Sequence, residues 1–166
     1  IYLDSHPDLY HDYEGDKYSH ACVVRRIIEE TDIKPSNIVQ VGIRAPTPEQ
    51  VEYADDQGIT IISTREFQNK GAAEIGTEIT NLFQQKVDFL YLSIDLDVLD
   101  PAYAPGLGNP QPGGISTREI IDLIHGLSDL PLSAIDMVEF CPKYDYSNIT
   151  AFVAAKLIQE SLGVMK

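Results

Sequence analysis

The chain has 166 residues, of which 43% are hydrophobic and 23% are charged, and its formal net charge is −14 at pH 7. This size and composition are those of a single globular domain spanning residues 1–166. The negative charge argues against nucleic acids and anionic membranes as partners, and no apolar run approaches the about 20 residues that a membrane span needs.

Predicted strands and helices alternate from the start of the chain. Ile1–Asp4 (IYLD) has the composition of the end of a buried strand. Ser19–Thr31 is predicted to be a helix, because apolar Val23, Ile27 and Ile28 recur at helical spacing.

The second strand–helix pair has clear boundary signals. Asn37–Ile43 (NIVQVGI) is predicted to be a buried strand. Thr47 is a suitable N-cap for a helix, with Pro following it and Gln50 three positions later. This helix is expected to run to about Gln57, with Gly58 ending it.

The middle of the chain contains the most apolar segment. A short strand over Ile59–Ile62 is followed by an amphipathic helix over Gly71–Lys86. The next strand, Phe89–Ile94 (FLYLSI), is continuously apolar, which is typical of a parallel strand covered on both faces. A long Pro- and Gly-rich loop over Asp100–Gly114 then leaves the end of this strand, where open α/β sheets bind ligands.

The last part of the chain completes the alternation. Ser116 begins a capping box and a helix to about Leu127, Leu132–Phe140 is the next strand, and Asn148–Leu162 is the closing helix. Strands alternating with helices predict a three-layer α/β/α sandwich with a mainly parallel sheet. Cys22 and Cys141 are isolated, which indicates reduced thiols in a cytoplasmic protein.

Two clusters of ionisable residues each follow a predicted core strand. Alternate side chains leave an extended backbone on the same side, so Asp4, His6 and Asp8 can converge from one strand end. Asp95 and Asp97 can converge from another. Carboxylates gathered at the edge of a core repel each other and are costly to desolvate unless a cation neutralises them.

Either cluster alone could be a turn or a helix cap, because Asp and His are common there. Both clusters together favour a metal site. Carboxylates with one imidazole suit Mn²⁺ or Mg²⁺ better than a thiolate-type zinc site. Two ions that share carboxylates would use this many ligands better than one ion would.

Three ordered motifs resemble those of the ureohydrolase family, which includes arginases and agmatinases. Ser93–Gly114 is similar to that family's signature segment, and Asp4–Asp8 is similar to its D-A-H-x-D motif, with Ser5 in place of Ala. Asp136–Pro142 is similar to its D-x-V-E-x-N-P segment, with Cys141 in place of Asn. The resemblance extends over the whole chain and implies the arginase-like fold.

The resemblance implies a manganese-dependent hydrolase that converts a guanidinium group to urea and an amine, using a hydroxide held between two metal ions. Asp4 and Asp95 would bind both ions. The full set of metal ligands carried over by motif is Asp4, His6, Asp8, Asp95 and Asp97.

Three residues match catalytic positions of the family. Asp8 would also pass a proton to the leaving amine, His20 would shuttle protons at the mouth of the site, and Glu139 would pair with the substrate guanidinium. Without the resemblance, His20 could be a solvated helix residue and Glu139 a buried carboxylate bonded to backbone. His11 and His125 are expected to be structural or solvent-facing.

The substrate suggested by the resemblance is agmatine, which would give urea and putrescine, a step of polyamine biosynthesis. Arginases have Asn where this chain has Tyr10, and the stretch 13–20 is more like agmatinases, in particular those of archaeal type. Arginine and other guanidino acids remain alternatives. The family also implies a homo-oligomer, a trimer or a hexamer.

One metal motif of the family, an upstream G-G-x-H segment, has no counterpart in the sequence. We therefore expect a C-terminal portion of the enzyme that lacks the first strands of the sheet. One ion site would keep only Asp4, Asp8 and Asp95, so turnover is expected to be poor. One alternative is a metal-binding or assembly module without catalysis. A second alternative, a metal-dependent amide hydrolase of the deacetylase type, is disfavoured because its lysine amide substrate has no guanidinium for Glu139 to bind.

Overall fold

The structure is a computed structural model that describes residues 1–84 and 86–166. Five strands form one sheet in the order β3-β2-β1-β4-β5, and every neighbouring pair is parallel. The strands are β1 (Tyr2–Leu3), β2 (Val39–Ile43), β3 (Thr60–Ser63), β4 (Leu90–Asp95) and β5 (Leu132–Val138). The predicted parallel sheet is confirmed.

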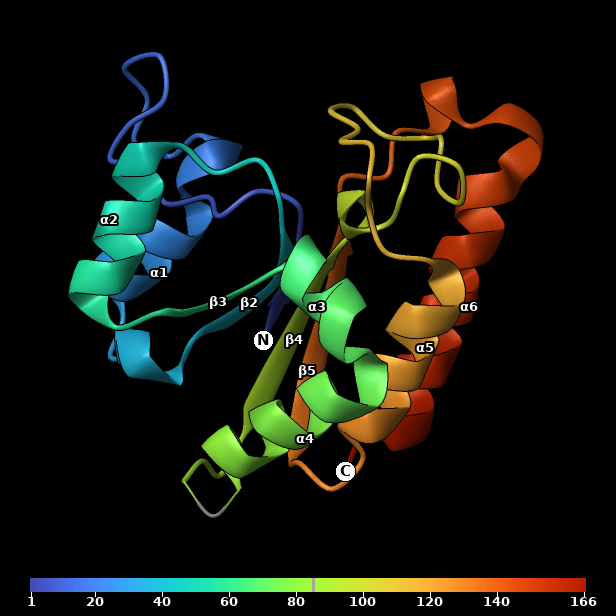
Figure 1. Ribbon diagram of the computed structural model, residues 1–166. Coiled ribbons are helices and arrows are strands. Elements are labelled where there is room, and N and C mark those ends of the chain that lie inside the picture. Colours follow the sequence, from blue (N-terminus) through green and yellow to red (C-terminus); the bar gives the residue numbers. More distant parts are fainter. Residues whose placement is uncertain (85) are drawn as a thin grey trace.

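Helices lie on both faces of the sheet, with α1 and α2 on one side and α3 to α6 on the other (Figure 1). This arrangement confirms the predicted α/β/α sandwich. The helices are α1 (Val23–Glu30), α2 (Pro48–Gln57), α3 (Thr64–Lys70), α4 (Ala72–Phe83), α5 (Thr117–Gly126) and α6 (Ile149–Val164). No helix within the two described ranges is long and apolar enough to cross a membrane.

The two sides of the sheet have separate hydrophobic cores. In β1, Tyr2 joins the smaller core with α1 and α2, whereas Leu3 joins the larger core under α3 to α6. Successive side chains of a strand point to opposite faces, so a two-residue strand contributes to both cores. The short β1 is therefore fixed from both sides, and the residues that follow it have a rigid base.

The strand order places a topological switch between β1 and β4. From β1 the chain builds outward through β2 and β3, and then returns to β4 on the other side of β1. Parallel sheets bind ligands outside the carboxyl ends of the strands at such a point. The two acidic clusters follow β1 and β4, so both lie at this position.

The helix α3 is absent from the sequence prediction, although a signal for it exists. The tetrapeptide Ser-Thr-Arg-Glu starts both α3, at Ser63, and α5, at Ser116. In both helices the N-cap Ser accepts a hydrogen bond from the backbone N–H of the Glu, Glu66 in α3 and Glu119 in α5. Only seven residues long, α3 has too little apolar periodicity to be recognised by pattern alone.

One prediction about apolar side chains is wrong. The continuous apolar run Phe89–Ile94 was expected to be covered on both faces, but the side chains of Phe89 and Tyr91 are 79% and 51% exposed. Helices α1 and α2 cover the β1–β3 side of that face and leave β4 open. In α1, Val23 is 41% exposed and Val24 is the buried residue.

Element boundaries differ from the predictions by a few residues. The predicted helix over 19–31 begins with a 3-10 turn at His20–Cys22, and only then becomes α1. The helix predicted over 71–86 ends at Phe83, and residue 85 of that range lies outside the described residues. The predicted strand over 132–140 ends at Val138, because Glu139 takes a positive φ of 62°.

Gly42 is expected to be intolerant of a side chain. It has a φ of 95° at a register shift in β2, and an added Cβ would lie 2.5 Å from Cγ2 of Val98 and 3.1 Å from the backbone oxygen of Asp4. Gly42→Ala should reduce the free energy of unfolding by about 2–4 kcal/mol, from backbone strain plus overpacking. Gly58→Ala, where φ is 76° and nothing lies within 4 Å, should cost only about 1 kcal/mol. Equal losses in urea denaturation would contradict the crowding argument.

Candidate active site

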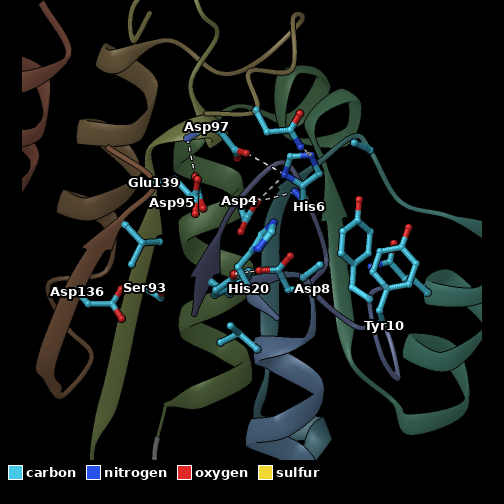
Figure 2. A pocket seen from close by; sticks show the side chains of 18 residues that line it. Asp4, His6, Asp8, Tyr10, His20, Ser93, Asp95, Asp97, Asp136 and Glu139 are labelled. Carbon is cyan, nitrogen blue, oxygen red and sulfur yellow. Dashed lines mark hydrogen bonds and ion pairs between the residues drawn. The ribbon is translucent and has the colours of Figure 1, made fainter. Parts of the chain in front are cut away.

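A pocket of about 310 Å³ lies at the carboxyl ends of β1 and β4. It contains every site residue expected from the sequence, and their side chains converge on it from the carboxyl ends of β1, β4 and β5 and from the 3-10 turn before α1 (Figure 2). The seven residues are Asp4, His6, Asp8, His20, Asp95, Asp97 and Glu139. The fold thus brings together residues from Asp4 to Glu139, which lie near opposite ends of the chain.

Three of these residues form a group with the geometry of a metal site. Ligand atoms of Asp4, His6 and Asp97 all lie within 4.8 Å of one another. Nδ1 of His6 is 2.8 Å from Oδ2 of Asp97 and 3.6 Å from Oδ1 of Asp4. Oδ2 of Asp4 is buried and has no hydrogen-bond partner among the described residues. A buried carboxylate oxygen left without a partner is costly, and a divalent cation would satisfy it.

Backbone N–H groups hold the carboxylates in place. Asp4 accepts a hydrogen bond of 2.6 Å from the N–H of His6, and Asp97 accepts one of 2.9 Å from the N–H of Ser5. Asp95 accepts one of 2.8 Å from the N–H of Asp97. Each of these carboxylates has one oxygen held by the backbone in this way. The turns after β1 and β4 therefore create the site locally.

Crowding of the acids shifts their pKa values upward. Burial raises the pKa of Asp4 to about 8, with further contributions from Asp97 and Asp8. Burial and the charges of Asp4 and Asp97 raise the pKa of Asp95 to about 11. These shifts mean that the folded chain holds the carboxylates in their charged forms only at a cost, which a bound cation would remove.

The ion pair of His6 and Asp97 has the opposite character. Burial opposes the charged forms of both side chains, but at His6 the hydrogen bonds that its ring donates to the carboxylates of Asp4 and Asp97 outweigh burial and raise its pKa to about 10. Bonds from His6 and the N–H of Ser5 keep the pKa of Asp97 below its usual value. Nδ1 of His6 therefore lies between the carboxylates of Asp97 and Asp4.

Asp8, Asp95 and Glu139 line the pocket outside the tight metal group. Oδ2 of Asp8 accepts a hydrogen bond of 2.6 Å from the hydroxyl of Tyr2, and burial raises the pKa of Asp8 to about 6. Asp8 has a φ of 51° and Glu139 a φ of 62°. Non-glycine residues rarely adopt such values, and they gather at functional sites where the surrounding structure supports the strain.

The histidines differ in position. His20 is exposed at the mouth of the pocket, with its ring 6.1 Å from that of Tyr13. His11 contacts Asp12 on the surface, and Nε2 of His125 lies 2.6 Å from Oε2 of Glu160. Neither His11 nor His125 lines the pocket, and both side chains face solvent, as expected.

Sequence reasoning missed several residues around the site. The side-chain amides of Asn109 and Gln111 lie 3.2 and 3.3 Å from Nε2 of His6. Arg44 donates hydrogen bonds to backbone oxygens of Asp97 and Gln111. The long loop after β4 indicated a functional role, but no motif indicates which of its side chains turn inward.

Comparison with known proteins identifies the family. The sequence model described as the Arginase family matches residues 1–163. The chain belongs to the arginase family. Proclavaminate amidinohydrolase of Streptomyces clavuligerus is 37% identical over 98% of this chain and 52% of that protein. Agmatinase of Edwardsiella ictaluri is 35% identical over 99% of the chain and 51% of that protein. Arginase 1, mitochondrial, of Arabidopsis thaliana is 39% identical over 96% and 45%.

Solved structures of the arginase family have the same fold. The structure of the Streptomyces clavuligerus proclavaminate amidinohydrolase superimposes with a TM-score of 0.92 at 34% identity, over 98% of this chain and 54% of that one. The chain therefore spans about half the length of the relatives that it matches. Members of the arginase family with different named substrates are similar to it at nearly equal identity, so overall similarity does not select the substrate.

Metal binding by this arginase-family chain is expected to strengthen as pH rises. In the folded chain the pKa of Asp4 is about 8 and that of Asp95 is about 11, both above the usual 3.8. Protonation of these two carboxylates therefore stabilises the folded state fully below about pH 4. This stabilisation is lost as the pH rises through 8 and 11. Divalent ions compete with protons for the same oxygens. For each proton that the ion displaces, its affinity should therefore increase about tenfold per pH unit. Mn²⁺ titrations at pH 6, 7 and 8 measure this, and equal affinities would contradict it.

Proposed function

We propose that this chain forms the metal-binding and guanidinium-binding half of an amidinohydrolase that converts a guanidino compound to urea and an amine. The observation that carries the proposal is the partnerless buried oxygen of Asp4 within the group Asp4, His6 and Asp97. Family membership supports the reaction class, and agmatine is our first substrate, with putrescine as the amine.

The charge of the pocket supports a cationic substrate. Six carboxylates and two histidines are among its described lining residues, and no Lys or Arg is among them. A guanidinium ion is planar and donates paired hydrogen bonds that match a carboxylate. Glu139 is exposed within the pocket, close enough to Asp95 to raise the pKa of that residue. We assign Glu139 the role of pairing with the substrate guanidinium.

Asp4, His6, Asp8, Asp95 and Asp97 would hold two divalent ions, for which we propose Mn²⁺, since carboxylates with one imidazole suit it. Bound ions of this kind supply Lewis acidity that makes water nucleophilic near neutral pH. The chain's own residues then handle the protons. Asp8, which accepts a hydrogen bond from the hydroxyl of Tyr2, would take a proton and pass it to the leaving amine. His20 at the mouth would exchange that proton with solvent.

The distal end of the substrate separates agmatine from the guanidino acids. A substrate carboxylate would need a cation beside the pocket, whereas the described lining offers the phenol rings of Tyr10 and Tyr13 near the mouth. Aromatic faces and acidic neighbours favour a second ammonium group over a carboxylate. This preference supports agmatine ahead of arginine, guanidinobutyrate or guanidinopropionate.

The test is urea release by the Mn²⁺-loaded chain from a panel of agmatine, arginine and 4-guanidinobutyrate. Agmatine is expected to be hydrolysed with the highest kcat/KM of the three. If the chain binds Mn²⁺ stoichiometrically but releases no urea from any of them, the alternative of a metal-binding or assembly module without catalysis is favoured. Light scattering of the same sample tests the proposed trimer or hexamer.

A further inference from the structure

A closed ring of hydrogen bonds joins the two acidic clusters of the pocket. Ser5 lies between two members of the metal group, Asp4 and His6, and its backbone N–H donates a bond of 2.9 Å to Oδ1 of the third member, Asp97. The backbone N–H of Arg44 donates a bond of 2.9 Å to the carbonyl oxygen of Ser5. Nη2 of Arg44 donates one of 2.6 Å to the carbonyl oxygen of Asp97. Arg44 therefore holds both partners of the contact that connects the clusters.

The guanidinium of Arg44 binds mainly backbone oxygens. It also donates to the carbonyl oxygens of Val98 and Leu99, each at 3.2 Å, and so holds three successive residues of the turn after β4. Nε and Nη2 both donate to the carbonyl oxygen of Gln111, at 3.0 and 2.6 Å, in the loop that follows. Within the described residues, this guanidinium forms no hydrogen bond with a carboxylate. A planar fork of N–H donors can hold several acceptors at fixed angles, which an ammonium group cannot.

The charge of Arg44, taken alone, would weaken a cation site. Burial lowers the pKa of Arg44, and the charges of Asp97, Asp100 and Asp4 oppose that shift, so the guanidinium lies within electrostatic reach of two carboxylates of the metal group. A fixed positive charge at this range repels a divalent cation. Any benefit of Arg44 to metal binding must therefore come from the geometry that it imposes, and must exceed this repulsion.

We propose that Arg44 is a positioning residue that sets the spacing between the two acidic clusters around a divalent cation. It acts through the backbone of Ser5 and Asp97 and touches neither the cation nor the substrate. The inference rests on the metal site of the proposed function. It adds that the affinity of this site, and the size of ion that it prefers, depend on a side chain that is not itself a ligand.

The first test sets geometry against charge, because the two predict opposite signs. Arg44→Met removes the donors and the charge, and should weaken Mn²⁺ binding at least about tenfold in calorimetric titration. Loss of the charge alone would strengthen it. Arg44→Lys keeps the charge but has three donors at one point, and should weaken binding about threefold or more. Unchanged or tighter binding in both variants would overturn the proposal.

The second test separates the spacing of the site from the stability of the fold. Ca²⁺ accepts flexible coordination at about 2.3–2.6 Å, longer than smaller divalent ions require. A site whose two clusters are no longer held together should tolerate Ca²⁺ better, so the ratio of Ca²⁺ to Mn²⁺ affinity should rise at least about threefold in both Arg44 variants. A variant that is merely less stable loses the same factor for every ion, because only the folded fraction binds.

Thr64→Val is the matched control. Thr64 is buried, and its hydroxyl lies 3.5 Å from Nη1 of Arg44 and donates a bond of 2.5 Å to the carbonyl oxygen of Gly42. The substitution removes a contact of the same guanidinium but leaves the ring through Ser5 and Asp97 intact. It should lower the midpoint of urea denaturation, while the Mn²⁺ affinity and the ratio of the two ions stay within about twofold.

The outcomes distinguish this inference from the function on which it rests. If the unmodified chain binds no Mn²⁺, the metal site and the inference both fail. If it binds Mn²⁺ and the ratio of the two ions is unchanged in Arg44→Lys, only the positioning role fails. The same holds if Thr64→Val changes the ratio as much, because general loosening would then explain it. Should Arg44→Met not fold, Arg44→Lys decides alone, since it keeps the charge and most of the side chain.

Discussion

Asp95→Asn is expected to stabilise the metal-free chain and to destabilise the chain in the presence of Mn²⁺. Without metal, the buried carboxylate faces Asp4 and Asp97, and its pKa is raised to about 11. At pH 8 the unfolded chain ionises this group freely while the folded chain resists it, so its removal should add about 1–4 kcal/mol to the free energy of unfolding. With Mn²⁺, the same substitution removes an anionic ligand.

The magnitude of the metal-dependent effect follows from linkage. An ion present at a hundred times its dissociation constant stabilises the folded state by about 2.7 kcal/mol, and this contribution should largely vanish in Asp95→Asn. Urea denaturation at pH 8 with and without about 1 mM Mn²⁺ provides both values. The reversal of sign is specific to a site in which carboxylates are assembled for a cation.

Asp100→Asn is the matched control for this prediction. Asp100 lies just beyond the same strand, but it accepts hydrogen bonds from the N–H groups of Ala102, Gly113 and Gly114, which hold its pKa below its usual value. Its replacement should therefore reduce stability equally with and without Mn²⁺. If Asp95→Asn behaves like Asp100→Asn, the acidic cluster is structural and the metal site is wrong.

Much of the fold could be predicted because its signals are local. The capping residues Thr47 and Ser116 start α2 and α5 as expected, and both form complete capping boxes. The open face of β4 could not be predicted, because a continuous apolar run does not tell which neighbours cover it. The exposed Tyr91 depends on where α1 and α2 pack, which is a property of the whole sheet.

The residues of the candidate site also divide into those that the sequence predicts and those that it does not. Asp4, His6 and Asp97 were predictable, because alternation along a strand and the parallel order of the sheet bring them together. The inward orientation of Asn109 and Gln111 was not, since it depends on hydrogen bonds from Arg44 across the loop. Side chains on strand ends follow simple geometry, whereas those on long loops follow contacts that are distant in sequence.

Glu139→Gln is expected to remove most of the affinity for the guanidinium group. The substitution keeps the size of the side chain but removes the charge and one of two acceptors of a paired interaction. Leaving a guanidinium without its carboxylate should cost about 2–5 kcal/mol, or a loss in affinity of about thirtyfold or more. Calorimetric titration of the Mn²⁺-loaded chain with agmatine measures this even if turnover is slow.

Asp136→Asn makes the same change of charge in the same pocket, at a residue of β5, the strand that Glu139 follows. Both oxygens of Asp136 are already engaged, one by the hydroxyl of Ser93 and one by that of Tyr91, each at 2.7 Å. The carboxylate of Asp136 is therefore not free to pair with a ligand. Removing its charge should lower agmatine affinity by less than about threefold, through long-range electrostatics alone. Equal losses in the two variants would mean that the pocket attracts guanidinium by its total charge. A loss confined to Glu139→Gln would place the binding at that carboxylate, where the strained backbone at a φ of 62° turns it out of the strand.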